Sequence, residues 1–215
     1  FLHRLCSIIV STGSLTTTSL TRMASAANYK DPDGFDAYAD TVGAGIYSGN
    51  VKKDANGNVL WGKQYQNHNP NPGPIYDGTG YTKMAKAIHT GDPKVVETLL
   101  KQDKDLVDEI MTGGARPLHT CGMSKKGQLV TQLIIDYGGD INAMDTYGYT
   151  PLHRMASNNL PIGAEALLKA GAKWDQKSGK PYSGETPMNI ALQSSAYDVI
   201  KVLQKYGDKE EKNEI

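Results

Sequence analysis

Apolar residues between positions 77 and 207 recur in blocks spaced about 34 residues apart. The tetrapeptide Thr150-Pro151-Leu152-His153 has an upstream counterpart at 116–119 (Arg-Pro-Leu-His) and a downstream counterpart at 186–189 (Thr-Pro-Met-Asn). A weaker copy at 77–84 keeps the Gly-x-Thr spacing. Each copy is followed by a second apolar pair, at Leu99-Leu100, Ile134-Ile135, Leu167-Leu168 and Val202-Leu203. The pattern predicts four similar units, each with two helices.

Local signals place the start and end of the helices in each unit. A glycine precedes the Thr position by two residues in every copy, and a turn with positive φ is predicted at Gly80, Gly114, Gly148 and Gly184. Thr at 150 and 186 is expected to cap a helix, with Pro in the first helical position, where its missing N–H costs nothing. A glycine that ends the second helix of the unit is expected at Gly138, Gly171 and Gly207.

A period in the low thirties with a Thr-Pro-Leu-His signature resembles the ankyrin repeat. The resemblance covers residues 77–207, about three-fifths of the chain. It implies an all-α repeat fold: a solenoid of helix pairs with β-turn fingers, here in four units preceded by an irregular N-terminal arm. The residues that carry the structural motif are Pro117, Leu118, His119, Thr150, Pro151, Leu152, His153, Thr186 and Pro187.

The resemblance also implies recognition of another protein through the finger tips and inner helices, and it implies no shared catalytic centre. We expect the fingers to display partner-binding residues, because aromatic side chains dominate binding hot spots. The residues expected there are Met111, Thr112, Thr146, Tyr147, Tyr149, Trp174, Tyr182 and Glu185. The alternative is that Tyr147 and Tyr149 stack on adjacent fingers and serve stability.

Residues 31–76 are rich in Gly, Asn, Asp, Pro and Tyr and have no helical period. They contain an Asn56-Gly57 pair between strand-like pieces, which predicts a hairpin. They also carry too many large apolar groups for a free linker, so we expect this arm to cover the open face of the first unit. Residues 208–215 are expected to form a solvated tail.

Residues 1–30 contain no Asp or Glu and are dense in Ser and Thr. That composition suits an organelle transit peptide, but Met23 also resembles a true start that would make residues 1–22 a leader or a fragment edge. Both interpretations stay open. The two cysteines, Cys6 and Cys121, indicate no disulfide framework, so we expect a reducing intracellular compartment, either the cytoplasm or an organelle.

The chain has 23 Lys and Arg against 23 Asp and Glu, which argues against nucleic acid as a partner. No apolar stretch approaches the roughly 18 residues that a membrane span needs, so direct insertion into a membrane is not expected.

His119 and His153 end successive Pro-Leu-His runs, where the resemblance implies hydrogen bonds to the turn backbone and the capping Thr. No zinc-ligand spacing and no cofactor motif occurs, and the Asp54-x-Asn56-x-Asn58 run lacks the Gly and Glu of a calcium loop. Asn142 lies in the turn between two units, where some ankyrin proteins are hydroxylated, and a hydrogen-bonding structural Asn fits the same place.

The sequence therefore predicts a protein that is not an enzyme, acting as an adaptor or scaffold with no cofactor and another protein as partner. It would be a monomer or part of a hetero-complex. The alternative is a structural subunit anchored in a larger complex through the aromatic N-terminal arm.

Overall fold

The structure is a computed structural model that describes residues 49–62, 72–77, 81–180 and 184–213. The expectations for residues 1–30, for Gly80 and for Tyr182 lie outside these ranges.

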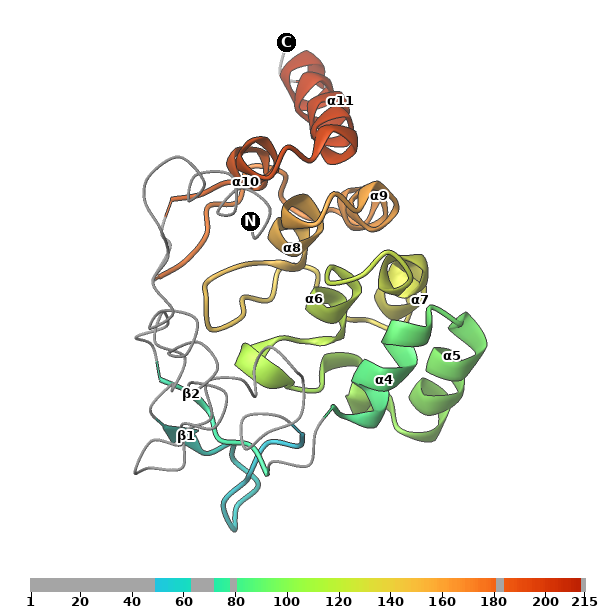
Figure 1. The fold of residues 1–215 in the computed structure, drawn as a ribbon, viewed down its shortest axis with the longest axis vertical. Helices are drawn as coiled ribbons and strands as arrows, with labels where there is room; N and C mark the ends of the chain where they lie inside the picture. The colour runs from blue at the N-terminus through green and yellow to red at the C-terminus, as the bar shows by residue number, and fades with distance from the viewer. Residues whose placement is uncertain (1–48, 63–71, 78–80, 181–183, 214–215) are drawn as a thin grey trace, which may run out of the picture.

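The described residues form a stack of four helix pairs (Figure 1). One row of helices contains α4, α6, α8 and α10, and the second row contains α5, α7, α9 and α11. The pairs are α4 (Lys83–Thr90) with α5 (Pro93–Gln102), α6 (Pro117–Cys121) with α7 (Thr131–Asp136), α8 (Pro151–Ser157) with α9 (Pro161–Lys169), and α10 (Pro187–Gln193) with α11 (Tyr197–Asn213). Three short 3-10 segments complete the helical structure: η1 (Lys104–Asp108), η2 (Thr112–Gly114) and η3 (Gly127–Val130). The predicted helical repeat fold is confirmed.

We call α4, α6, α8 and α10 the inner helices and α5, α7, α9 and α11 the outer helices. The inner helices begin where the sequence pattern predicted. Thr82 Oγ1 accepts the backbone N–H of Ala85 at 3.1 Å, and Thr186 Oγ1 accepts that of Asn189 at 3.2 Å. The prolines at 117, 151 and 187 occupy the first turn of α6, α8 and α10. These contacts satisfy N–H groups that a helix start leaves without an intrahelical partner.

The glycines before the inner helices have the expected backbone conformation, with φ of +69° at Gly114, +78° at Gly148 and +99° at Gly184. Positive φ is costly for residues with a side chain, which explains glycine at these turns.

The closing glycines divide into two groups. Gly138 and Gly171 end α7 and α9 with φ above +90°. Gly207 does not end its helix, because α11 continues to Asn213. The expectation of a helix end at Gly207 was therefore wrong. Gly207 lies beside the ring of Trp174. A β-carbon added at Gly207 would lie 3.6 Å from that ring.

A continuous apolar core runs through the stack between the two rows of helices. Its largest fully buried side chains include Met84, Leu118, Leu152, Leu167 and Leu203, each at most 1% exposed. Each pair contributes residues to this one cluster, so no pair has a separate core. Neighbouring pairs consequently stabilise one another, as expected of a repeat protein.

Two amide side chains cap the outer helix of the following pair. Gln128 Oε1 accepts the backbone N–H groups of Ile162 and Gly163 at the start of α9, at 3.1 and 3.4 Å. Asn159 Oδ1 accepts those of Asp198 and Val199 at the start of α11, at 3.1 and 3.3 Å. Consecutive pairs are thereby fixed to each other by polar contacts as well as by the core.

The described part of the arm folds as a small antiparallel sheet. Strand β1 (Trp61–Gly62) pairs with β2 (Gly73–Pro74), and isolated bridges join Val51 to Tyr76 and Lys53 to Val59. Gly57 has a φ of +83° in the turn between Lys53 and Val59, so the predicted hairpin is confirmed. The Asp54 carboxylate accepts N–H groups of Asn56 and Asn58 within this turn.

The described part of the arm contacts the segment before the second helix pair, because β2 packs against η2. Much of the arm, residues 31–48 and 63–71, lies outside the described ranges, so the expectation that the arm covers the open face of the first pair stays a prediction. The contact is polar and local: the Tyr76 hydroxyl donates to the carbonyl of Met111 and accepts the N–H of Gly114. Tyr76 itself is 6% exposed.

Of the helices in the described ranges, not one combines the length and the apolar character needed to traverse a bilayer.

Candidate functional site

Three turns project from the same side of the stack, and we call them the second finger (111–115), third finger (145–149) and fourth finger (178–185) (Figure 1). A backbone hydrogen bond joins the two ends of each finger: the N–H groups of Met111, Asp145 and Ser178 donate to the carbonyls of Ala115, Tyr149 and Glu185, respectively. The described part of each finger lies between the helices of consecutive pairs. The finger surface is thus built from repeated local turns.

The fingers are hydrogen-bonded to one another. The Thr146 N–H donates to the Gly113 carbonyl at 3.0 Å, and the Thr146 hydroxyl donates to the same oxygen at 2.7 Å. The Gly179 N–H donates to the Gly148 carbonyl at 2.8 Å. With the Tyr76 contacts, these bonds link the arm and three fingers into one ladder.

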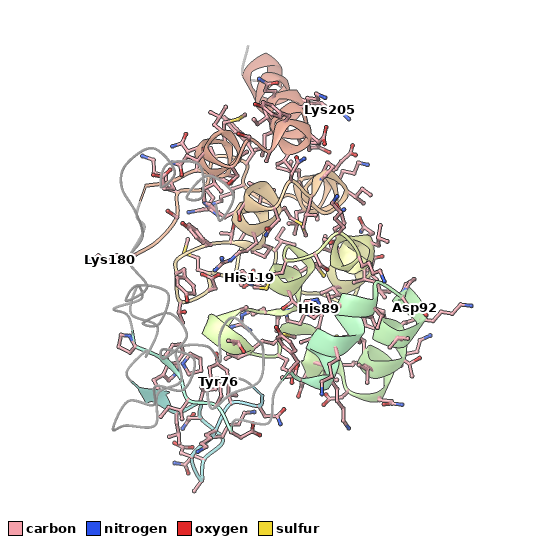
Figure 2. The ribbon with its side chains drawn as sticks, viewed as in Figure 1. Tyr76, His89, Asp92, His119, Lys180 and Lys205 are labelled. Atoms are coloured by element: carbon pink, nitrogen blue, oxygen red, sulfur yellow. The ribbon has the colours of Figure 1, made fainter. Side chains whose placement is uncertain are left out.

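The motif histidines join each inner helix to the next finger. His119 Nδ1 accepts the Arg116 N–H at 3.1 Å, and Nε2 lies 2.9 Å from the Tyr149 carbonyl. A backbone N–H can only donate and a carbonyl can only accept, so the ring is neutral with its proton on Nε2. His153 repeats the arrangement one unit later, between the Thr150 N–H and the Glu185 carbonyl. Figure 2 shows His119 in the interior of the stack.

Burial keeps both rings neutral. Loss of solvent lowers the pKa of His119 to about 4 and also lowers the pKa of His153. Both side chains are 0% exposed. An acid/base or metal-binding role would need an accessible ring nitrogen, and each nitrogen already has a partner. Their position favours a structural function.

A buried ion pair organises the third finger. The Asp145 side chain is 1% exposed, accepts the N–H groups of Tyr147 and Tyr149, and pairs with Arg154 from α8. The Arg154 guanidinium also lies over the rings of Tyr147 and Tyr149, at 5.3 and 5.0 Å from their centroids. The carboxylate is therefore satisfied inside the protein and presents no charge to a partner.

The two tyrosines of the third finger differ in their packing. The Tyr149 ring stacks on His153 with 5.6 Å between centroids, so it packs the third finger against α8, the helix that follows it in the same unit. Tyr147 is half-buried and passes close to Gly113, where a β-carbon would lie 3.3 Å from its ring. The alternative interpretation of packing on an adjacent finger is thus supported for Tyr147, which is half-buried, whereas the Tyr149 ring packs on the helix of its own unit.

The other residues expected on the finger surface are placed as follows. Met111 is 4% exposed, so it was wrongly expected to be displayed: its side chain packs in the core below the arm. Thr112 and Thr146 are half-buried, and Trp174 packs partly against the core. Glu185 is half-buried and accepts a hydrogen bond from Gln193. Whether the accessible ones contact a partner stays a prediction.

A groove of about 310 Å³ lies between the arm and the fingers. Trp61 and Pro72 form the arm side, and Ile110, Gly114 and Arg116 contribute from the second finger and its flanks. The third and fourth fingers add residues around Met144, Thr146, Gly148 and Lys180. Figure 2 shows Tyr76 on the arm side and Lys180 at the edge of the fourth finger. The groove is continuous with the hydrogen-bonded ladder.

Sequence reasoning missed Trp61 and Lys180 as surface residues of this groove. Trp61 is 57% exposed, although it lies in a strand. The sequence contained one indication of this exposure: Trp61 lies in a short segment that has too few residues to bury an indole ring. Its position beside the fingers could not be deduced, because it depends on the docking of Tyr76.

Within the described ranges, no group of three or more His, Cys, Asp or Glu side chains is arranged to hold a metal ion. Cys121 is fully buried, and burial raises the pKa of its thiol to about 12, so the reactive thiolate is not formed at neutral pH. Asn142 is exposed, and its N–H donates to the Asp140 carboxylate at 2.9 Å. Hydroxylation of Asn142 stays a prediction.

A family model described as ankyrin repeats, in three copies, matches residues 118–213. A putative ankyrin repeat protein of Rickettsia felis is 32% identical over 142 residues, which cover 62% of this chain and 32% of that protein. Protein phosphatase 1 regulatory subunit 27 of Mus musculus is 34% identical over 103 residues, covering 48% of this chain and 64% of its own. The probable 26S proteasome regulatory subunit p28 of Saccharomyces cerevisiae is 27% identical over 179 residues, covering 73% and 74%. The chain thus spans about a third of the first of these relatives and just under two thirds of the second.

Proposed function

The chain is an ankyrin repeat protein, matched to that family over residues 118–213, and from this premise we propose that it is a non-catalytic adaptor or scaffold. Ankyrin repeats are generally protein-interaction modules and are typically non-catalytic, which implies protein partners. The partner would be held at the fingers.

The observation that carries the proposal is the groove between the arm and the three fingers. Its walls come from the second, third and fourth fingers and from the arm, and hydrogen bonds of the finger ladder join them. A rigid surface loses little conformational freedom on binding, which favours affinity. The carboxylate in the lining is committed to an internal contact, since Asp145 pairs with Arg154.

The second candidate function is a structural subunit of a larger complex. Two observations favour it: Leu60, Trp61 and Ile75 on the arm sheet are 39–57% exposed, and two of the similar proteins carry the word subunit in their names. The arm would then be the anchoring element. The two functions differ in the lifetime of the complex and in the residues that hold it.

Affinity capture of partners from a native lysate of the source organism, with the full chain as bait, tests the proposal. We expect Tyr147→Ser to reduce recovery of the specific partner at least about tenfold, because Tyr147 is a half-buried aromatic ring of the third finger and aromatic rings dominate hot spots. Quantitative mass spectrometry of the captured proteins gives the measurement.

Tyr197→Ser is the matched control, since Tyr197 is 67% exposed at the start of α11 and lies outside the fingers. Equal loss of partner from both variants, or from neither, contradicts an adaptor that uses its fingers. A partner that survives Tyr147→Ser but is lost when Trp61 is replaced by Ala, and that co-migrates with the chain on native gels, selects the subunit function.

A further inference from the structure

We propose that the side of the stack opposite to the fingers binds an acidic amphipathic α-helix of a partner protein. That side carries a row of exposed apolar side chains at the turns between inner and outer helices, and we call it the turn edge: Val95, Met123, Leu129 and Ile162. Figure 2 shows Asp92, just before α5, on the opposite side of the stack from Lys180 of the fourth finger. The inference goes beyond the proposed function, because neither the fingers nor the groove contributes to the turn edge.

The apolar side chains of the turn edge belong to neighbouring turns. Val95 lies in the first turn of α5, Leu129 in η3 and Ile162 in the first turn of α9. Segment η3 packs against both α5 and α9, and the Gln128 side chain accepts the Ile162 N–H at 3.1 Å. Each member of the row is 42–55% exposed. Single apolar residues in water are ordinary, whereas a row across three consecutive units indicates an interaction surface.

The spacing of the row favours a helix as the occupant. Packed helices lie about 8 to 10 Å apart, so members of the row on consecutive units are separated by about that distance. Residues seven positions apart on one face of an α-helix are about 10.5 Å apart. Side chains on one face of a strand recur at about 6.7 and 13 Å, which matches the row less well. A partner helix with an apolar residue at every seventh position can therefore contact Val95, Leu129 and Ile162 together.

Three exposed lysines flank the row: Lys94, Lys125 and Lys126. None of them forms an ion pair with another residue of the described ranges. Lys126 lies against the preceding turn, because a β-carbon added at Gly91 would lie 2.9 Å from the β-carbon of Lys126. The lysines of the first and second turns are thereby brought to one end of the row.

Negative charge offsets only part of this cationic end. Asp92 is exposed beside Lys94, and its carboxylate accepts the Lys94 N–H at 2.9 Å, so it cancels one of the three lysine charges. Glu97 on α5 is already paired with Lys101. Two positive charges stay in excess, and the N-terminal ends of α5 and α9 add positive potential. This end of the turn edge therefore attracts carboxylates on the partner helix.

A lipid surface also accepts apolar and cationic side chains, but the charge of the turn edge is small for that role. Polybasic segments that bind anionic lipid carry about four to eight Lys or Arg. The turn edge has three lysines with Asp92 among them. A helix with a few carboxylates beside its apolar face matches this small excess, so the charge favours a protein partner.

Selection on the immobilised full chain from a phage-displayed library of helical peptides, with Leu at every seventh position and random residues beside it, tests the inference. We expect the selected peptides to be enriched in Asp and Glu beside the Leu positions. Leu129→Ser is expected to weaken a selected peptide at least about tenfold, because it removes apolar surface that the peptide covers. Lys125→Glu combined with Lys126→Glu is expected to weaken it by a similar factor and to reduce the salt dependence of its binding. Fluorescence anisotropy of the synthetic, dye-labelled peptide measures both effects.

The matched controls lie on the arm. Trp61→Ala changes an apolar side chain that is 57% exposed, and Lys52→Glu combined with Lys53→Glu changes two adjacent exposed lysines. Binding of the selected peptide must survive both.

Three results overturn the inference: no selected peptide, selected peptides without acidic enrichment, or affinities that the Leu129 and Lys125/Lys126 variants leave unchanged. Co-sedimentation of the chain with phosphatidylserine vesicles that Leu129→Ser abolishes also overturns it, because the turn edge then binds lipid. Partner capture that depends on Tyr147 is unaffected by any of these results, so the proposed function is tested separately.

Discussion

Replacing Gly148 with Ala is expected to lower the free energy of unfolding by about 3 to 4 kcal/mol. Gly148 has a φ of +78°, and a β-carbon there would lie 2.4 Å from the backbone carbonyl carbon and oxygen of Gly179. Backbone atoms cannot rotate away as a side chain can. The third and fourth fingers would have to separate, which breaks the 2.8 Å hydrogen bond between Gly179 and Gly148.

Gly171→Ala is the matched control for this prediction. Gly171 has a φ of +93°, but nothing lies within 4 Å of the added β-carbon, so only the backbone strain of about 1 kcal/mol applies. Urea unfolding followed by far-UV circular dichroism measures both variants. Equal losses of stability would mean that the close approach of the two fingers does not exist.

Acidification from pH 7.5 to pH 5 is expected to cost about 2 kcal/mol of stability through His119 alone. The unfolded ring binds a proton near its ordinary pKa of 6.5, whereas burial lowers the folded pKa to about 4. Between these values the unfolded state binds more protons, so stability is complete above pH 6.5 and falls as the pH drops toward 4. The lowered pKa of His153 acts in the same direction.

His119→Asn tests the origin of this acid sensitivity, because Asn occupies the matching position of the fourth unit, at Asn189. The variant is expected to be less stable at pH 7.5, since the hydrogen bonds of the ring to Arg116 and Tyr149 are lost or weakened. Its stability should also fall less steeply between pH 7.5 and 5. Parallel pH profiles for the two proteins, measured by urea unfolding, would show that His119 is not the titrating group.

Features encoded by neighbouring residues could be predicted from the sequence. The Thr-Pro starts of α8 and α10 and the positive φ of Gly114 and Gly148 follow from capping and backbone sterics, which act within a few residues. The Asn56-Gly57 hairpin belongs to the same class.

Contacts between units could not be predicted in this way. Gln128 caps a helix 34 residues further along the chain, and Asn159 caps one 39 residues away. An isolated Gln or Asn in a turn carries no local signal for such a partner. The same holds for His119, whose ring reaches the Tyr149 carbonyl across 30 positions.

The contact made by the described part of the arm could not be predicted from its apolar content. Composition favours the open helix face of the first unit, whereas β2 packs against η2. The actual contact is made by the phenol hydroxyl of Tyr76 with backbone groups of Met111 and Gly114, because the second finger leaves these groups available. For the same reason Met111 is covered and not displayed.

The described part of the arm and the fingers form one continuous, hydrogen-bonded surface, on which we propose that a partner binds. NMR-detected hydrogen exchange of the Thr146 and Gly179 amides tests it directly, because these two amides form the bonds between fingers. We expect protection comparable to that of core helix amides such as those of Leu167 and Leu203. Exchange at the rate of exposed turn amides would show that the fingers move independently and would contradict the account.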